Sequence, residues 1–264
     1  MNHGRTNGLL VGLMMVSPVV AADEPLVLGD KEFFTKGSFI AYAAPWSTYE
    51  GANSGLKQGV DFSDVIVVEK KAFPSNVEFA WHWPLAAPKE SGVYGYNAVS
   101  YGSYDGGVPE TPVEPKQVKE IRTLTETFTY EMAKPIGDFN VLTEFFLTKE
   151  KGGEEKVAEI GFFLRAAESA IAFANDGEKV GDFKDATGRI WKVSVQPAPA
   201  GPYFMFLPAA DVLQGTVDFK AGLDFLRSRG KLTGKEWFNG LAFGIEPIKG
   251  SGSLKLRSLV VSCK

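Results

Sequence analysis

The feature that most constrains the fold is a succession of short segments in which apolar and polar residues alternate. These segments are rich in Val, Ile, Phe, Tyr and Thr, and Gly, Pro, Asn and Asp separate them. Such alternation is typical of strands with one buried face, and many short strands with intervening turns indicate a β-sandwich or a β-barrel. The predicted strands cover residues 37–44, 60–69, 76–84, 93–104, 118–131, 138–149, 156–165, 188–196, 203–208, 239–246 and 253–262.

One segment has a helical pattern instead. Between residues 217 and 229, apolar side chains recur at i, i+4 and i+7, namely Phe219, Leu223 and Leu226. This is the apolar stripe of an amphipathic helix. Thr216 is the expected N-cap, and Gly230 is placed to take the left-handed position after the last turn. We therefore predict an all-β protein with one α-helix packed on its outside.

The N-terminal 22 residues resemble a secretory signal. Arg5 precedes the short apolar run Leu9–Val20, and small residues up to Ala22 would allow cleavage before Asp23. The alternative is an uncleaved N-terminal anchor, although the run is short for a membrane span. We expect 1–22 to be the signal and 23–264 to be one domain. The mature chain is then predicted to be an extracellular or periplasmic monomer with no membrane contact.

Carboxylates are the only abundant side chains suited to acid, base or nucleophilic catalysis, because Cys and His are scarce. The chain has one Cys, two His, 32 Asp and Glu residues, and a formal net charge of −4. One cysteine (Cys263) cannot form a disulfide within the chain, and Cys/His zinc sites lack ligands. The mild acidity argues against nucleic-acid binding. If the protein is an enzyme, carboxylates are expected to carry its chemistry, with no cofactor or metal.

Alternation within the strands singles out three carboxylates. In 157–164, Glu159 shares a face with Gly161 and Phe163, whereas the other face is apolar. Glu246 likewise shares a face with small residues, and Glu144 lies among residues 140–148. A carboxylate beside a glycine and an aromatic ring suits a face that binds a ligand. Taken alone, each could also be an ordinary solvated strand glutamate.

These segments resemble glycoside hydrolase family 12, which are secreted endo-β-glucanases with a jelly-roll fold. The clearest match is FGIEPIKGSGSLKLRSLVVS at 243–262, and EIGFFL at 159–164 and NVLTEFFLT at 140–148 also match family motifs. YNAVSYG at 96–102, FAWHWP at 79–84 and the predicted helix follow the family's order and spacing. The resemblance implies a sandwich of two antiparallel sheets, similar to concanavalin, with a concave cleft. It covers most of residues 37–264.

The resemblance also implies roles. Glu159 corresponds to the family's nucleophile, Glu246 to its acid/base and Glu144 to a helper carboxylate. The implied reaction is retaining hydrolysis of β-1,4-type linkages by double displacement. The family's asparagines are replaced around Trp46, and Gly161 and Phe163 replace Met and Trp beside the nucleophile. These departures favour retained hydrolysis with an altered substrate preference, and a weak or inactive member is the alternative.

Sugar binding is expected to rely on aromatic side chains, because flat rings stack on the apolar faces of pyranoses. The candidates for substrate binding are Trp46, Phe163, Trp81, Trp83, Tyr96 and Tyr101. A buried structural role is the alternative for Trp81 and Trp83, and His82 is expected to be a structural strand residue.

The sequence is consistent with three functional hypotheses. The first is hydrolysis of a β-glucan, which could be cellulose-like, mixed-linkage or xyloglucan. The second is a non-catalytic carbohydrate-binding protein on the same fold. The third is a transglycosylase that uses the same residues.

Overall fold

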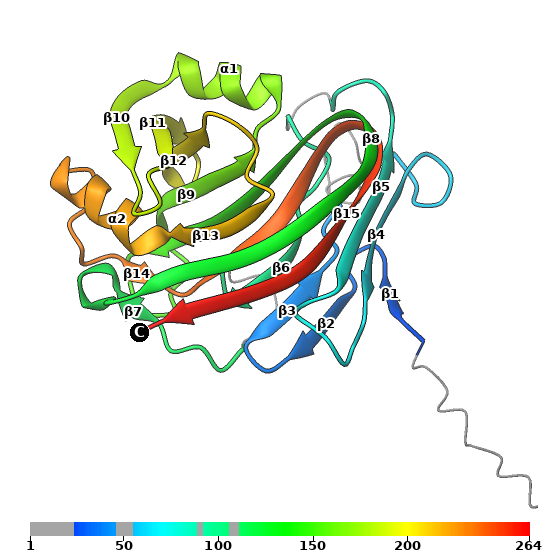
Figure 1. Ribbon diagram of the computed structural model, residues 1–264, viewed down its shortest axis with the longest axis horizontal. Coiled ribbons are helices and arrows are strands. Elements are labelled where there is room, and N and C mark those ends of the chain that lie inside the picture. The colour runs from blue at the N-terminus through cyan, green and yellow to red at the C-terminus, as the bar shows by residue number, and fades with distance from the viewer. Residues whose placement is uncertain (1–23, 46–54, 89–91, 106–110) are drawn as a thin grey trace, which may run out of the picture.

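The computed structural model describes residues 24–45, 55–88, 92–105 and 111–264 (Figure 1). The predicted signal and Trp46 lie outside these residues. The strands are β1 (Leu26–Leu28), β2 (Phe33–Lys36), β3 (Phe39–Tyr42), β4 (Ser63–Val68), β5 (Val77–Trp83), β6 (Asn97–Gly102), β7 (Lys116–Gln117), β8 (Leu124–Thr148), β9 (Lys156–Arg165), β10 (Glu178–Lys184), β11 (Ile190–Ala198), β12 (Gly201–Pro208), β13 (Gln214–Asp218), β14 (Trp237–Phe238) and β15 (Gly240–Cys263). The helices are the 3-10 turn η2 (Val118–Glu120), α1 (Glu168–Asp176) and α2 (Phe219–Ser228). Over these residues, no helix is long and apolar enough to cross a membrane.

Two long strands, β8 and β15, pair along their lengths and build both layers of the sandwich. The first half of β8 and the second half of β15 lie in layer 1, with β5, β4, β1 and β13. Their other halves lie in layer 2, with β6, β3 and β2 on one side and β9, β12, β11 and β10 on the other. Figure 1 shows both strands curving from one layer into the other. The predicted all-β sandwich is confirmed.

The bend depends on two glycines. Gly137 of β8 and Gly250 of β15 are register partners, and both have positive φ, at 95° and 85°. A Cβ at Gly137 would lie 2.2 Å from the Lys249 carbonyl oxygen. Because only glycine tolerates both this φ and this close backbone approach, the pair lets the strands turn together without losing their partner.

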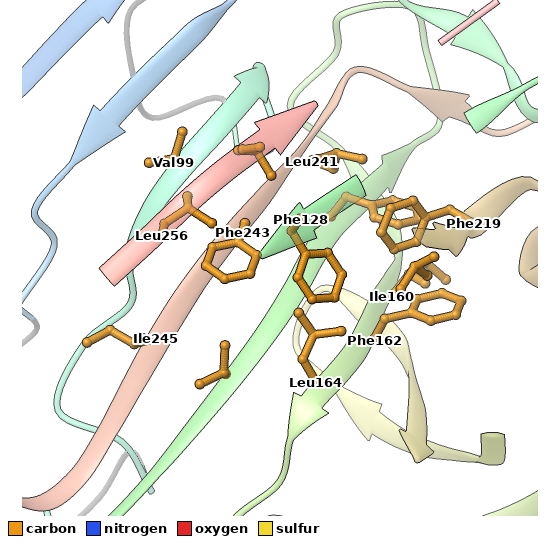
Figure 2. Packing of buried hydrophobic residues seen from close by; sticks show 14 of the residues in the cluster. Val99, Phe128, Ile160, Phe162, Leu164, Phe219, Leu241, Phe243, Ile245 and Leu256 are labelled. Carbon is orange, nitrogen blue, oxygen red and sulfur yellow. The ribbon is translucent and has the colours of Figure 1, made fainter. Parts of the chain in front are cut away.

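The hydrophobic core lies between the layers. Phe243 of layer 2 packs at 6.4 Å from Phe79 and at 5.8 Å from Phe128 of layer 1, measured between ring centroids. Figure 2 shows side chains from both layers and from α2 meeting in this core. The predicted apolar stripe of α2 is fully buried there. The face of layer 2 that points away from this core contains a cleft.

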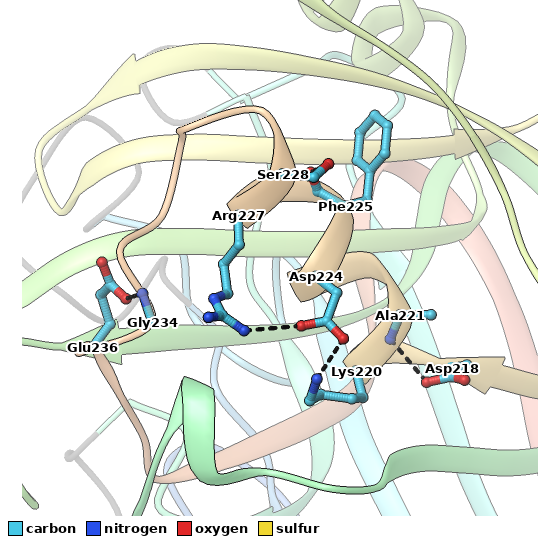
Figure 3. Close-up of polar contacts among 9 residues, drawn as sticks. All are labelled: Asp218, Lys220, Ala221, Asp224, Phe225, Arg227, Ser228, Gly234 and Glu236. Atoms are coloured by element: carbon cyan, nitrogen blue, oxygen red, sulfur yellow. Dashed lines mark hydrogen bonds and ion pairs between the residues drawn. The ribbon is translucent and has the colours of Figure 1, made fainter.

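The start of α2 differs from the prediction. Asp218, and not Thr216, is the N-cap, because its carboxylate accepts a hydrogen bond of 3.0 Å from the Ala221 N–H (Figure 3). Thr216 lies in β13 and bonds Thr127 of β8 instead, with 2.8 Å between hydroxyl oxygens. Gly230 adopts φ 69° after the helix, as predicted.

The Asp218→Ala variant is therefore expected to lose stability by about 1 kcal/mol, because one helix N–H loses its acceptor. Thr216→Ala is the matched control and should change the free energy of unfolding by no more than about 0.5 kcal/mol. Urea unfolding of both variants measures the difference. An equal loss for both would show that the cap does not stabilise α2.

Candidate active site

Three glutamates lie on the face of layer 2 that points away from the core. Alternation along β8, β9 and β15 sends Phe145, Ile160 and Ile245 into the core. It sends Glu144, Glu159 and Glu246 to the opposite face. The register sets Glu144 of β8 opposite Gly161 of β9 and Ala242 of β15. Glu144 lies on the central strand of the three, is buried, and has small residues beside it on both neighbouring strands.

Glu159 and Glu246 line a single cleft of about 410 Å³. Its floor includes Phe163 of β9, Met205 of β12 and Ile248 of β15. The cleft thus offers apolar surface with two carboxylates, which is the composition of a site for an amphipathic ligand.

Burial raises the pKa of each carboxyl, and neighbouring negative charges add to the rise for Glu159 and Glu144. Burial raises the pKa of Glu159 to about 7, and the charge of Glu246 adds to the rise, whereas the Lys156 ammonium opposes it. Burial also raises the pKa of Glu246 to about 7, against a hydrogen bond from Asn140. The pKa of Glu144 lies well above its usual range because of burial and then the charges of Glu159 and Glu246. At neutral pH the group therefore holds both ionised and protonated carboxyls, as acid–base chemistry requires.

The Asn140 side chain connects Glu246 to the start of the helix α1. Its side-chain N–H₂ donates to Glu246 Oε2 at 2.9 Å, and its carbonyl oxygen accepts from the Ala167 N–H at 2.8 Å. Ala167 is the N-cap residue of α1. One buried amide thus fixes both a carboxylate and the helix beside the cleft.

Tyr203 of β12 occupies the space above Gly161. Any Cβ at Gly161 would lie 2.5 Å from the Tyr203 hydroxyl oxygen, so a larger residue would displace the ring. From there the hydroxyl donates to Glu144 Oε2 over 3.5 Å. Gly161 is thus the residue that gives the phenol access to Glu144.

The aromatic candidates divide between the cleft and the interior. Phe163, which is 2% exposed, is one of the residues that line the cleft, and its contact with substrate stays a prediction. Tyr96 lies on the same face, but it is buried and its hydroxyl donates to the Ala242 carbonyl oxygen at 2.6 Å. It supports the floor of layer 2 and leaves no free surface for a sugar.

Trp81, Trp83 and Tyr101 do not lie in the cleft, which corrects their predicted contact with substrate. Trp81 and Trp83 share a face of β5, as predicted, but that face points into the core. Trp83 is stacked between Phe62 and Tyr94, at 4.0 and 4.4 Å between centroids, and its indole N–H donates to Asp64. Tyr101 packs on Phe39 at the edge of the same core. His82 is exposed on the opposite face of β5.

Four features of the site were missed by the sequence reasoning: Asn140, Tyr203, Lys156 and α1. Lys156, the first residue of β9, forms an ion pair with Asp105, and its ammonium lies 4.0 Å from the Phe146 ring centroid. α1 has no wide apolar stripe, so only its content of strong helix formers, Ala and Glu, could have signalled it. Among the described residues, no group of three or more His, Cys, Asp or Glu side chains could hold a metal ion.

No protein-family model matches this sequence, and no curated protein sequence matches it. Solved structures do match its fold. Endoglucanase 3 of Trichoderma harzianum, from family GH12, aligns with a TM-score of 0.71 and 18% identity, over 92% of this chain and all of that chain. A family 12 xyloglucanase of Bacillus licheniformis aligns with a TM-score of 0.71 and 16% identity, over 90% and 100%.

A third structure, the catalytic domain of Humicola grisea Cel12A in complex with a soaked thio-cellotetraose, gives a TM-score of 0.72 at 12% identity, over 90% and 99%. The fold of this chain is therefore the GH12 jelly roll, which confirms the predicted fold class. At these identities the likeness concerns the fold.

Proposed function

We propose that this chain, which has the jelly-roll fold of the GH12 enzymes, is a β-glucan hydrolase. The observation that carries the proposal is the pair Glu159 and Glu246, which line one cleft and whose pKa values are both raised to about 7. The solved neighbours add support, since they are described as endoglucanases and xyloglucanases.

The proposed reaction retains the anomeric configuration. Ionised Glu159 attacks the anomeric carbon, and the bond to the leaving oxygen breaks while Glu246 gives that oxygen its proton. Water then attacks the anomeric carbon, its bond to Glu159 breaks and releases the carboxylate, and Glu246 takes the proton of the water. Glu144, held by Tyr203, remains protonated and can donate a hydrogen bond within the cluster.

The proposed substrates are β-1,4-linked glucans, either cellulose-like, mixed-linkage or xyloglucan. Incubating the protein with soluble forms of all three and measuring released reducing ends tests the proposal. We expect internal cleavage of at least one of them. If the protein binds a glucan but releases no reducing ends from any, it is a carbohydrate-binding protein and hydrolysis is ruled out.

The pH profile offers a second test, through Asn140. Its N–H₂ lowers the pKa of Glu246, so Asn140→Ala should raise that pKa. Because Glu246 must be protonated in the first step, the alkaline limb of kcat/KM should move to higher pH. Losing a hydrogen bond to a charged group should also reduce kcat/KM roughly 10–100-fold. Asn175 is an exposed asparagine on α1, and Asn175→Ala is the control. An alkaline limb that does not move in Asn140→Ala would contradict the role of Glu246 as the proton donor.

A further inference from the structure

The helix α1 forms one wall of the cleft. It begins three residues after β9, the strand of Glu159, and is drawn beside β10–β12 in Figure 1. Ser169, Ala170 and Phe173 of α1 line the same cleft as Glu159 and Glu246. The Phe173 side chain is 48% exposed, so an open aromatic face stands beside the two carboxylates.

The backbone that carries this ring is held by three sets of contacts. Asn140 accepts from the Ala167 N–H at the start of α1. The Gln196 side chain of β11 donates to the Phe173 carbonyl oxygen. Ala170 and Ala174 are buried in the cluster that also holds Phe163 and Met205. The backbone that carries Phe173 is thus anchored to β8 and β11, which favours a preorganised binding surface.

We propose that Phe173 is a stacking platform for a pyranose ring of the bound glucan and sets the affinity of the cleft for that ring. A β-linked glucose unit has equatorial hydroxyls and an apolar C–H face, so it fits an exposed aromatic ring on one side and carboxylates at its edge. The inference rests on the proposed function, because it assigns a specificity-determining residue to the same cleft.

Ile171 of α1 is a suitable control position for Phe173. Ile171 is the other large apolar side chain exposed on α1, at 41%. It lines a separate hollow with residues of β10, β11 and β12, and neither Glu159 nor Glu246 lies there. Removing Ile171 therefore takes a similar apolar surface from the same helix without touching the cleft of the carboxylates.

Binding of cellotetraose and of soluble mixed-linkage β-glucan, measured by calorimetry in a Glu159→Gln background, tests the platform without turnover. Phe173→Ala should weaken binding roughly 3–10-fold, whereas Phe173→Tyr and Ile171→Ala should bind like the parent. In the otherwise unchanged enzyme, Phe173→Ala should raise KM by the same factor and leave kcat nearly constant.

Equal affinity of Phe173→Ala and its parent for both glucans would overturn the platform, as would an equal loss in Ile171→Ala. Failure of the parent to bind either glucan would overturn it too. The proposed function fails separately: if hydrolysis is absent but Phe173→Ala still weakens binding while Phe173→Tyr does not, the platform stands and the enzyme proposal falls.

Discussion

Replacing Glu159 by glutamine is expected to abolish glucan hydrolysis, with kcat falling on the order of 10⁴–10⁶-fold, the scale seen when an enzyme loses its nucleophile. Glutamine keeps the size of the side chain, but its amide cannot form a glycosyl ester. The change also removes one negative charge from beside Glu144 and Glu246, so the fold should be retained. Reducing-end release measured at enzyme concentrations in the micromolar range gives the residual rate.

Replacing Glu246 should have a different signature. Without its proton donor, the first step depends on how readily the leaving group departs, so Glu246→Gln should lose about 10²–10⁴-fold on polysaccharide. An aryl glucoside with an acidic phenol leaves without protonation and should be cleaved at close to the parental rate in the first step. Glu159→Gln should fail on both substrates, because the nucleophile is needed for either.

Glu155→Gln is the matched control for both variants. Glu155 is an exposed glutamate between β8 and β9, where it forms an ion pair of 3.0 Å with Lys149. It should retain parental activity. Full activity in Glu159→Gln, or inverted stereochemistry of the first product seen by NMR, would contradict the retaining mechanism.

Strand alternation was sufficient to place the three glutamates on the right face. The prediction for 156–165 matches β9 at both ends, and Glu159 points away from the core as expected. This works because the opposite face of β9 is packed against the core without interruption, so the sequence has to keep it apolar.

The bent strands could not be predicted. Residues 118–131 and 138–149 read as two strands because Pro135 and Gly137 resemble a turn, yet β8 runs unbroken from Leu124 to Thr148. The same holds for β15, where Gly250 sits in the gap between two predicted strands. Local residues signal a change of direction, but only the partner strand decides whether pairing continues through it.

The tryptophans show a second limit. Alternation correctly gives Trp81 and Trp83 one face of β5, and it cannot say whether that face meets the core or the solvent. The tertiary structure decides this: the Trp83 ring fills the gap between Phe62 and Tyr94, and its N–H finds a buried acceptor in Asp64. Contacts such as these join residues far apart in the sequence.

Phe162→Ala is expected to be the most destabilising change in the core. The side chain is fully buried on the core face of β9. Its ring stacks on Phe206 of β12, with 4.0 Å between centroids and 11° between planes, and meets the edges of Phe219 and Trp191 at 5.0 and 5.2 Å. Removing a ring from such packing costs about 3–5 kcal/mol, from lost burial and from the cavity left behind.

The packing of α2 makes relaxation into that cavity difficult. Gly222 of α2 approaches the Phe162 ring so closely that a Cβ there would lie 2.5 Å from its Cζ. The helix is also held by its cap at Asp218 and by its stripe of side chains already buried in the core, so it cannot simply move inward. The midpoint of thermal unfolding should fall by about 6–20 °C.

Phe173→Ala provides the comparison, because it removes the same ring from a surface position and should change stability by no more than about 0.5 kcal/mol. A loss below 1 kcal/mol in Phe162→Ala would mean that α2 and β12 do not close over this ring. Since Phe162 lies between Gly161 and Phe163 of the cleft face, a loosened β9 should also weaken glucan binding. Stability and affinity should therefore fall together in Phe162→Ala, whereas Phe173→Ala should lose affinity alone.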